Sequence, residues 1–244
     1  MLPGTLFSLW GLWWQFAVAA ARAPKFVAKP HWSLHRTQHM EAKLKMMLPL
    51  VGVAVELFAH PSDVRFRHPL DAGRWDQHSA VNWQHAAMYV AFAFSGALDL
   101  LTTRPAFAAI PAGVNWTALC GAFAIECMLF VFHVRMQSAF VADLHVLLVV
   151  LVVANAVAVL AASLMPSSIT ASMLVGYFML AQGTWFMWQA RVLYGPNRWD
   201  LTDTVGNELM LPVLFTFHLL LSAALSLSIA LATAASYRRR DDFE

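Results

Sequence analysis

Long apolar runs are the feature that most restricts what this chain can fold into. Residues 146–165, VLLVVLVVANAVAVLAASLM, contain one asparagine, one serine and no charged residue. A helix of about 20 apolar residues is as long as the hydrocarbon core of a bilayer is thick. Charged residues make up 12% of this chain, whereas soluble domains carry about 25%. The sequence therefore predicts an integral membrane protein.

Seven segments meet the hydropathy criterion for transmembrane helices. The connections between them carry no second domain and no convincing internal repeat. We therefore expect one all-α domain, residues 1–244, folded as a seven-transmembrane-helix bundle. The last segment is longer than a bilayer requires, which favours a tilted helix or one that emerges into the cytosol. The predicted spans are residues 2–21, 44–60, 82–103, 112–134, 142–165, 169–193 and 208–236.

The distribution of lysine and arginine predicts the orientation of this bundle. An odd number of spans places the two termini on opposite sides of the membrane. One side holds the 22–43 loop with the adjacent Lys45, the 104–111 loop and the C-terminal tail, and it receives ten of the 16 basic residues. Because the side richer in basic residues is cytoplasmic, we expect an N-terminus outside or in a lumen and a cytosolic C-terminus.

Charge and cysteine content limit the partners that we expect. The net charge of +2 is too small, and its basic residues too dispersed, for nucleic-acid binding. Cys120 and Cys127 are seven residues apart in one apolar run, too far for a disulfide within one helix. The expected partners are membrane lipids, and homo- or hetero-oligomers that form through helix faces, in an endomembrane or the plasma membrane.

Ionisable side chains occur inside the predicted spans, where each costs at least about 2.5–3.5 kcal/mol on insertion scales. Such residues usually face the bundle interior and pair with one another. Glu126 and His133 are seven residues apart and fall on one helical face, as do Glu56 and His60 at a spacing of four. On the assigned orientation, most of the histidines lie toward the outer end. The spacing therefore predicts a polar layer in the outer half of the bundle.

Histidine with aspartate or glutamate is a ligand set for zinc, iron and manganese. We predict a His/Glu-lined cavity that binds a Zn, Fe or Cu ion, with haem as the weaker candidate. An enzyme with this site would be a metal-dependent hydrolase or oxidoreductase acting on a lipid-like substrate, with Glu126 or Glu56 as general base. The predicted metal ligands are His85, His133, His145 and His218. The polar residues expected around them are Tyr89, Asp99, Asp143, Gln182, Trp185, Gln189 and Asn207.

Two other functions fit the same residues. The buried polar groups of a non-catalytic structural or trafficking subunit would form interhelical hydrogen bonds that fix packing. A transporter or proton path would need a polar line that continues to the cytosolic side, where only Asp99 and the basic loop extend. The absence of an inverted repeat also weakens the transporter interpretation.

Several segments resemble one known family over nearly the whole chain and in the same order. They are LPGTLFSLWGLWW (2–14), WQHAAMYVAFAFSGALDLL (83–101), Glu126, His133 and His145, QGTWFMWQ (182–189), and WDLTDTVGN (199–207) followed by His218. This pattern resembles the transmembrane protein 45 family, which includes the transmembrane epididymal proteins and is catalogued as domain of unknown function 716. The resemblance implies a single seven-helix multi-pass domain and no established reaction.

The resemblance also marks individual positions. The matching polar positions include Glu56, His85, Asp99, Glu126, His133, His145, Gln182, Trp185, Gln189, Asn207 and His218. This chain departs from the family at its His-x-His motif, where it has His133, Val134 and Arg135, and at an acidic position occupied by Val141. If the second histidine of that motif is a ligand, Arg135 removes it. The metal interpretation then depends on the four histidines named above.

Overall fold

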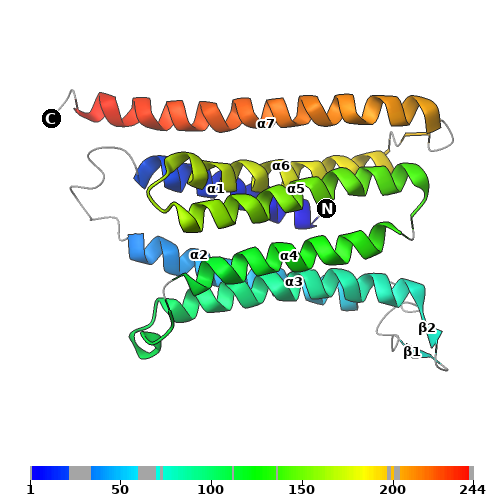
Figure 1. The fold of residues 1–244 in the computed structure, drawn as a ribbon, viewed down its shortest axis with the longest axis horizontal. Helices are drawn as coiled ribbons and strands as arrows, with labels where there is room; N and C mark the ends of the chain where they lie inside the picture. Colours follow the sequence, from blue (N-terminus) through cyan, green and yellow to red (C-terminus); the bar gives the residue numbers. More distant parts are fainter. Residues whose placement is uncertain are drawn as a thin grey trace. The chain divides into compact units, whose positions relative to one another are not determined.

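The computed structural model describes residues 2–21, 34–59, 70–71, 74–111, 113–135, 137–196, 199–200 and 204–241. Within these ranges the chain is almost entirely helical (Figure 1). The α-helices are α1 (Leu2–Ala21), α2 (Leu34–Phe58), α3 (Gln77–Thr102), α4 (Val114–Val134), α5 (Ala139–Leu164), α6 (Ile169–Tyr194) and α7 (Thr204–Asp241). The all-helical prediction is thus confirmed, apart from the short strands β1 (Leu70–Asp71) and β2 (Arg74–Trp75), which pair antiparallel.

Two helices differ clearly from the predicted spans. Helix α2 begins at Leu34, ten residues before the predicted start at 44, and α7 runs on to Asp241, beyond the predicted end at 236. The polar first turns of α2 lower its hydropathy without breaking its helical geometry. Pro49 and Pro212 lie inside these helices. The remaining predicted boundaries agree with the structure within a few residues.

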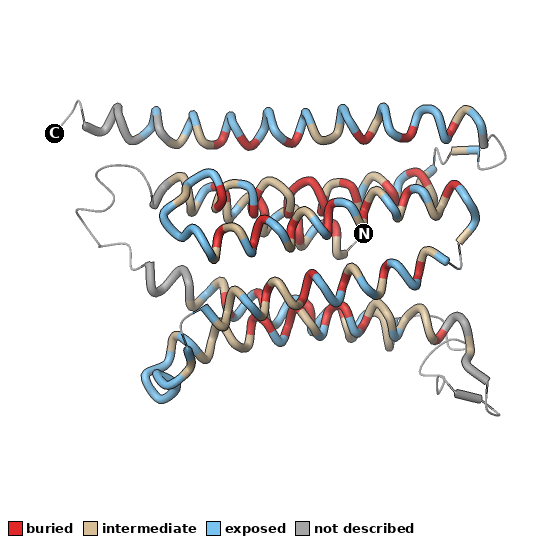
Figure 2. Tube along the Cα trace, in the orientation of Figure 1, coloured by how far each residue is buried: buried red, intermediate tan, exposed pale blue. Residues whose placement is uncertain are grey.

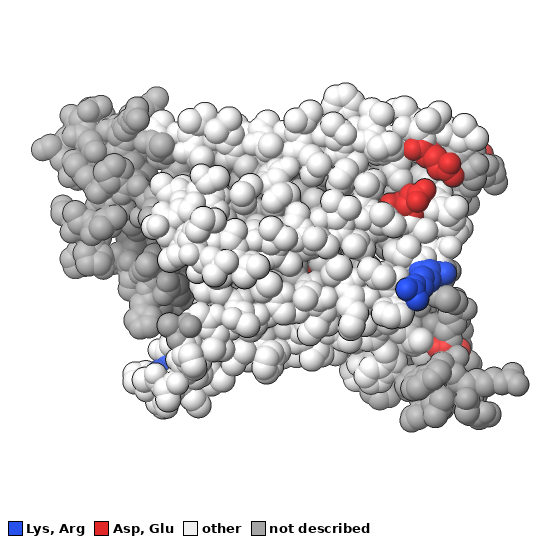
Figure 3. All heavy atoms as spheres, in the orientation of Figure 1, with Lys and Arg blue, Asp and Glu red and all other residues white. Residues whose placement is uncertain are grey.

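Four helical segments among the described residues are long and apolar enough to cross a membrane. Large apolar side chains are exposed in the middle of these helices, as Phe94 and Val157 illustrate at 62% and 60% exposure. Figure 3 shows one face of the molecule, on which the drawn charged side chains gather near the helix ends. These features are typical of a membrane protein. The four segments are Ser79–Thr102, Val114–Val134, Ala139–Leu164 and Val205–Thr233.

Local sequence signals define several helix ends. The Asp76 carboxylate accepts a hydrogen bond from the backbone N–H of Ser79 at 2.9 Å and so caps the start of α3. Ser168 caps α6 in the same way by accepting from Ala171. Gly113 precedes α4 with a φ of +89°, a left-handed conformation that favours glycine. The short 3₁₀ helix η1 (Pro105–Phe107) lies in the connection from α3 to α4.

The helices form two compact units. The first unit, residues 1–32 and 137–244, contains α1, α5, α6 and α7. The second unit, residues 33–136, contains α2, α3 and α4. In the first unit α6 packs against all three other helices, and in the second unit α3 packs against both α2 and α4. Each unit therefore has one central helix.

Close contact between α1 and α6 holds the first unit together. The two helices run antiparallel, because Gly4 lies against Met187 whereas Gly11 lies against Gly176 and Leu180. A Cβ atom on Gly11 would stand 2.5 Å from the backbone nitrogen of Leu180, so only glycine fits there. Small residues allow such close backbone approach between apolar helices. Helix α7 adds a single buried face, visible in Figure 2 as red segments recurring along a mostly exposed helix: Asn207, Leu211, Phe215, Ser222, Ser226 and Ile229.

Glycines also bring α2 and α3 together in the second unit. Gly52 faces the ring of Tyr89, and Gly96 lies against the backbone of Lys45. On the other side of α3, Phe92 packs edge-on against Phe123 of α4, with ring centroids 5.1 Å apart. The polar side chains of α3 are thereby held at fixed positions against both neighbouring helices.

We expect Gly11→Ala to destabilise the protein by roughly 1–3 kcal/mol, because the new methyl group overpacks the contact with α6. Thermal unfolding of the purified protein in one detergent measures this change. Gly121→Ala is the matched control, since a Cβ at this helical glycine meets nothing within 4 Å. Alanine there should be neutral or stabilise by up to about 1 kcal/mol. Equal melting temperatures for the two variants would contradict the close α1–α6 contact.

Candidate functional site

A cluster of imidazole, carboxylate and amide groups lies where the three helices of the second unit meet. His85 of α3 has its Nδ1 atom 3.3 Å from the Oε2 atom of Glu56 on α2. His133 of α4 has its Nδ1 atom 3.3 Å from the Oε1 atom of Gln84 on α3. The two imidazole rings lie 5.4 Å apart between centroids. We call Glu56, Gln84, His85 and His133 the imidazole cluster.

The two histidines differ in their exposure to solvent. The His133 residue is 6% exposed, and Phe130, one turn earlier, packs edge-on against its ring. The His85 side chain is 32% exposed and that of Glu56 is 19% exposed. The cluster is therefore buried on its α4 side and open on its α2–α3 side.

Two further ionisable residues lie deeper in the second unit. Glu126 of α4 is 2% exposed, and Tyr89 of α3 is also buried. The carboxylates of Glu56 and Glu126 both lie within electrostatic reach of the Tyr89 phenol. Glu126 and His133 are seven residues apart, which corresponds to about 10 Å along the helix. Along the helices, Tyr89 therefore lies between the imidazole cluster and Glu126.

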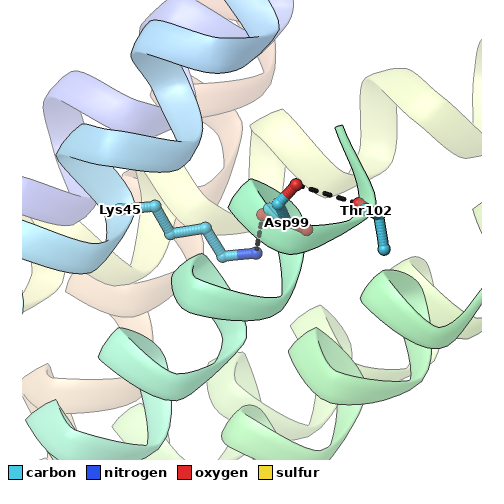
Figure 4. A network of polar contacts seen from close by, with 3 residues as sticks. All are labelled: Lys45, Asp99 and Thr102. Atoms are coloured by element: carbon cyan, nitrogen blue, oxygen red, sulfur yellow. Dashed lines mark hydrogen bonds and ion pairs between the residues drawn. The ribbon is translucent and has the colours of Figure 1, made fainter. Parts of the chain in front are cut away.

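A partly buried ion pair lies at the other end of α3. The Lys45 ammonium of α2 donates to the Oδ2 atom of Asp99 at 2.6 Å, and the Lys45 side chain is only 4% exposed (Figure 4). Thr102 donates its hydroxyl to the backbone oxygen of Asp99. One turn further on, the Nδ1 atom of His39 lies 3.4 Å from the Thr103 hydroxyl. Sequence reasoning assigned Lys45 to the cytosolic flank, because it precedes the apolar part of α2.

The predicted ligands His145 and His218 belong to the first unit. His145 of α5 donates from Nδ1 to the backbone oxygen of Val141, one turn earlier in the same helix, at 2.7 Å. The Nε2 atom of His218 on α7 lies 3.0 Å from the Ala181 backbone oxygen and 3.1 Å from the Thr184 hydroxyl, both on α6. His218 also packs edge-on against the Trp185 indole. The His218 contacts connect α7 to α6.

Buried amides join the other helices of the first unit. Asn155 of α5 donates to the Oε1 atom of Gln182 on α6 at 2.7 Å, and both residues are fully buried. Trp185 and Gln189 of α6 both donate to the backbone oxygen of Leu144 on α5. These contacts are hydrogen bonds between α5 and α6, as expected of polar groups that fix helix packing. Sequence reasoning missed Asn155, although it is the only amide in the apolar run 146–165 and could have been found there.

The remaining predicted cavity residues of the first unit lie near helix starts. Asn207, in the first turn of α7, donates to the backbone oxygen of Asp200 at 2.8 Å. Asp143, in the first turns of α5, is exposed. Asp143 therefore does not line a buried cavity within its own unit.

The structure brings together part of the predicted site. Within the second unit His85, His133 and Glu56 form one cluster, with Tyr89 beside it. His145 and His218 are in the other unit, so the four-histidine site stays a prediction. Among the described residues, no three His, Cys, Asp or Glu side chains are arranged to hold one metal ion. Gln84, which sequence reasoning did not select, orients His133 and adjoins the predicted ligand His85 in the sequence.

Residues 113–231 match the sequence model of a family described as "Family of unknown function (DUF716)". The match covers α4, α5, α6 and most of α7. It supports the family resemblance seen in the sequence and assigns no activity. His133 lies inside the matched segment, whereas His85, Glu56 and the Lys45–Asp99 pair precede it.

We expect Lys45→Met to lower the free energy of unfolding by about 3 kcal/mol, because it leaves the Asp99 carboxylate without its ion-pair partner. Denaturation of the purified protein with increasing SDS in mixed micelles measures this loss. The double variant Lys45→Met with Asp99→Asn should recover much of the stability, since no unpaired charge is left. A double variant no more stable than Lys45→Met would contradict this account.

Proposed function

We propose that the protein is a multi-pass membrane protein that binds a divalent transition-metal ion at the imidazole cluster. All seven helices cross the bilayer, with the N-terminus outside or lumenal and the C-terminus cytosolic. The shortest helix, α1, has 20 residues, which at about 1.5 Å per residue matches a hydrocarbon core of about 30 Å. The family relationship extends beyond the matched residues 113–231, so that the whole chain belongs to the transmembrane protein 45 family.

Three helices fall below a hydropathy threshold that the other four pass, and their compositions account for this. Helices α1 and α6 are rich in tryptophan and contain buried amides, among them Gln15, Gln182 and Gln189. Helix α2 carries Lys43, Lys45 and Glu56. Polar groups of this kind occur in transmembrane helices where they face other helices rather than lipid. Lys45 and the three glutamines are buried, which supports spans for all three helices.

The observation that carries the metal proposal is the arrangement around the two ring Nδ1 atoms. A metal-binding histidine usually places one nitrogen on the metal and the other against a carboxylate, carbonyl or water. In this cluster Nδ1 of His85 faces the Glu56 carboxylate, and Nδ1 of His133 faces the Gln84 amide oxygen. Nitrogen–metal bonds of about 2.0–2.1 Å place the centroids of two ligating rings roughly 5–6 Å apart. The observed separation is 5.4 Å.

The donor set limits which ion fits and how it is held. Imidazole nitrogen suits zinc, copper and iron. Two imidazoles from this unit leave further coordination positions for water or a substrate group, and open positions are typical of catalytic rather than structural sites. For an enzyme that acts on a lipid-like substrate, Glu56 is the nearer candidate for the general base, because its carboxylate contacts His85 within the imidazole cluster. Glu126 lies about two helical turns from His133, so it is the more distant candidate for the general base.

Interhelical packing is the second candidate role, and the first unit favours it. The side chains of Asn155, Gln182 and His218 each bond to a neighbouring helix of their own unit. Such bonds contribute about 0.6 kcal/mol each on average. The proposed division is therefore structural polar groups in the first unit and a binding site in the second.

We expect the purified full-length protein to bind Zn²⁺, and His133→Ala to weaken that binding at least tenfold, because one of the two assigned ligands is lost. Isothermal titration calorimetry in detergent measures the dissociation constant. His39→Ala is the matched control, since this histidine of the same unit contacts Thr103 outside the cluster. It should leave the dissociation constant unchanged.

The Gln84→Leu variant tests whether His133 is oriented as a ligand. Loss of an outer-shell partner typically weakens metal affinity by about 10–100-fold, so we expect a shift in that range with the fold intact. If His133→Ala and His39→Ala bind Zn²⁺ equally well, the metal proposal is wrong and the cluster is a packing contact.

A further inference from the structure

One fully buried amide of the first unit lies without a hydrogen-bond partner in the described part of the chain. Gln15 of α1 is 0% exposed, and neither its Nε2 nor its Oε1 atom has a partner among the described residues. The other two buried glutamines of this unit differ, since Gln182 accepts from Asn155 and Gln189 donates to Leu144. A buried amide without a partner costs free energy, so Gln15 requires a group that bonds to it.

The contact between α1 and α6 places the Gln15 side chain over a glycine. A Cβ atom on Gly176 would stand 2.6 Å from the Cγ atom of Gln15 and 3.1 Å from the backbone oxygen of Gly11. The space that a side chain at position 176 would fill is therefore lined by Gln15 and by a carbonyl oxygen. A carbonyl oxygen keeps a second lone pair after its helical hydrogen bond, so it can accept again.

The groups around this space are neutral. Helix α1 contains no charged residue, and the one charged residue of α6 is Arg191, which lies about 22 Å along the helix from Gly176. One turn before Gly176, the backbone oxygen of Ser172 already accepts from the Trp14 indole at 2.9 Å. Lipid chains supply no hydrogen bonds. The site therefore suits a neutral ligand that both donates and accepts, and full enclosure of Gln15 requires that ligand to be small.

We propose that the α1–α6 contact binds an internal water molecule at Gln15. The water accepts a hydrogen bond from Nε2 and donates its two protons to Oε1 and to the Gly11 carbonyl oxygen. Buried waters typically make about three hydrogen bonds, which is the number available here. The water satisfies the Gln15 amide and fills the space over Gly176, so it belongs to the packing of these two helices.

A crystal structure of the full-length protein, at a resolution that shows ordered waters, tests the site. We expect one density peak at about 2.7–3.2 Å from both polar atoms of the Gln15 amide. An ordered Gln15 without such a peak, or one whose amide bonds directly to another protein group, would overturn the proposal. Elongated density from a lipid or a detergent would also overturn it, because the proposed ligand is a single water.

The variant Gln15→Leu tests the site in solution. Leucine removes the water and leaves its remaining partner without a donor, so we expect the melting temperature in one detergent to fall by at least about 2 °C. If the amide were dry, leucine would remove its cost and raise the melting temperature. Gln182→Leu is the comparison variant, because it removes an amide with a known protein partner and should also lower the melting temperature.

A melting temperature of Gln15→Leu at or above that of the wild type would overturn the water site. If this variant does not fold, the density at Gln15 in the wild-type crystal decides the question. The result is independent of Zn²⁺ binding, because Gln15 belongs to the first unit and the imidazole cluster to the second.

Discussion

Polar groups enclosed between apolar helices must find partners within the protein, and this requirement organises both units. A buried hydrogen-bonding group without a partner costs about 1–3 kcal/mol. The Lys45 ammonium therefore pairs with Asp99, and Asn155 pairs with Gln182. The Lys45–Asp99 pair forms where the α2 and α3 backbones approach closely, since Gly96 of α3 lies against the backbone of Lys45. A small residue therefore allows this buried polar pair to form.

The two units satisfy the requirement with different chemistry. In the first unit several acceptors are backbone oxygens, such as that of Leu144 beneath Trp185, which neither bind nor release protons near neutral pH. In the second unit the contacts join ionisable side chains to each other, as in Glu56 with His85 and Lys45 with Asp99. Ionisable side chains can gain or lose a proton, or bind a metal ion, without movement of the helices. This difference is why we place the proposed binding function in the second unit.

Part of the candidate site could be read from the sequence because helical spacing is regular. Glu126 and His133 fall on one face, and both are buried as their seven-residue spacing predicts. Contacts between helices were harder to predict, since spacing within one helix carries no information about its neighbour. Lys45 illustrates this, because its position before an apolar stretch suggests a solvated flank, whereas its partner lies 54 residues later. Gln84 was overlooked for the same reason, since its role depends on His133 of another helix.

The sequence by itself determined the helical, membrane-type character of the chain, because about 20-residue apolar runs are dictated by hydropathy alone. It also determined most helix boundaries, since prolines, glycines and capping residues act over a few positions. Only the tertiary structure decided which polar groups meet, and it placed His85 and His133 in one unit and His145 and His218 in the other. The reason is physical: a face along one helix is fixed by 3.6 residues per turn, but the choice of neighbouring helix depends on how glycines and bulky side chains fit across the contact.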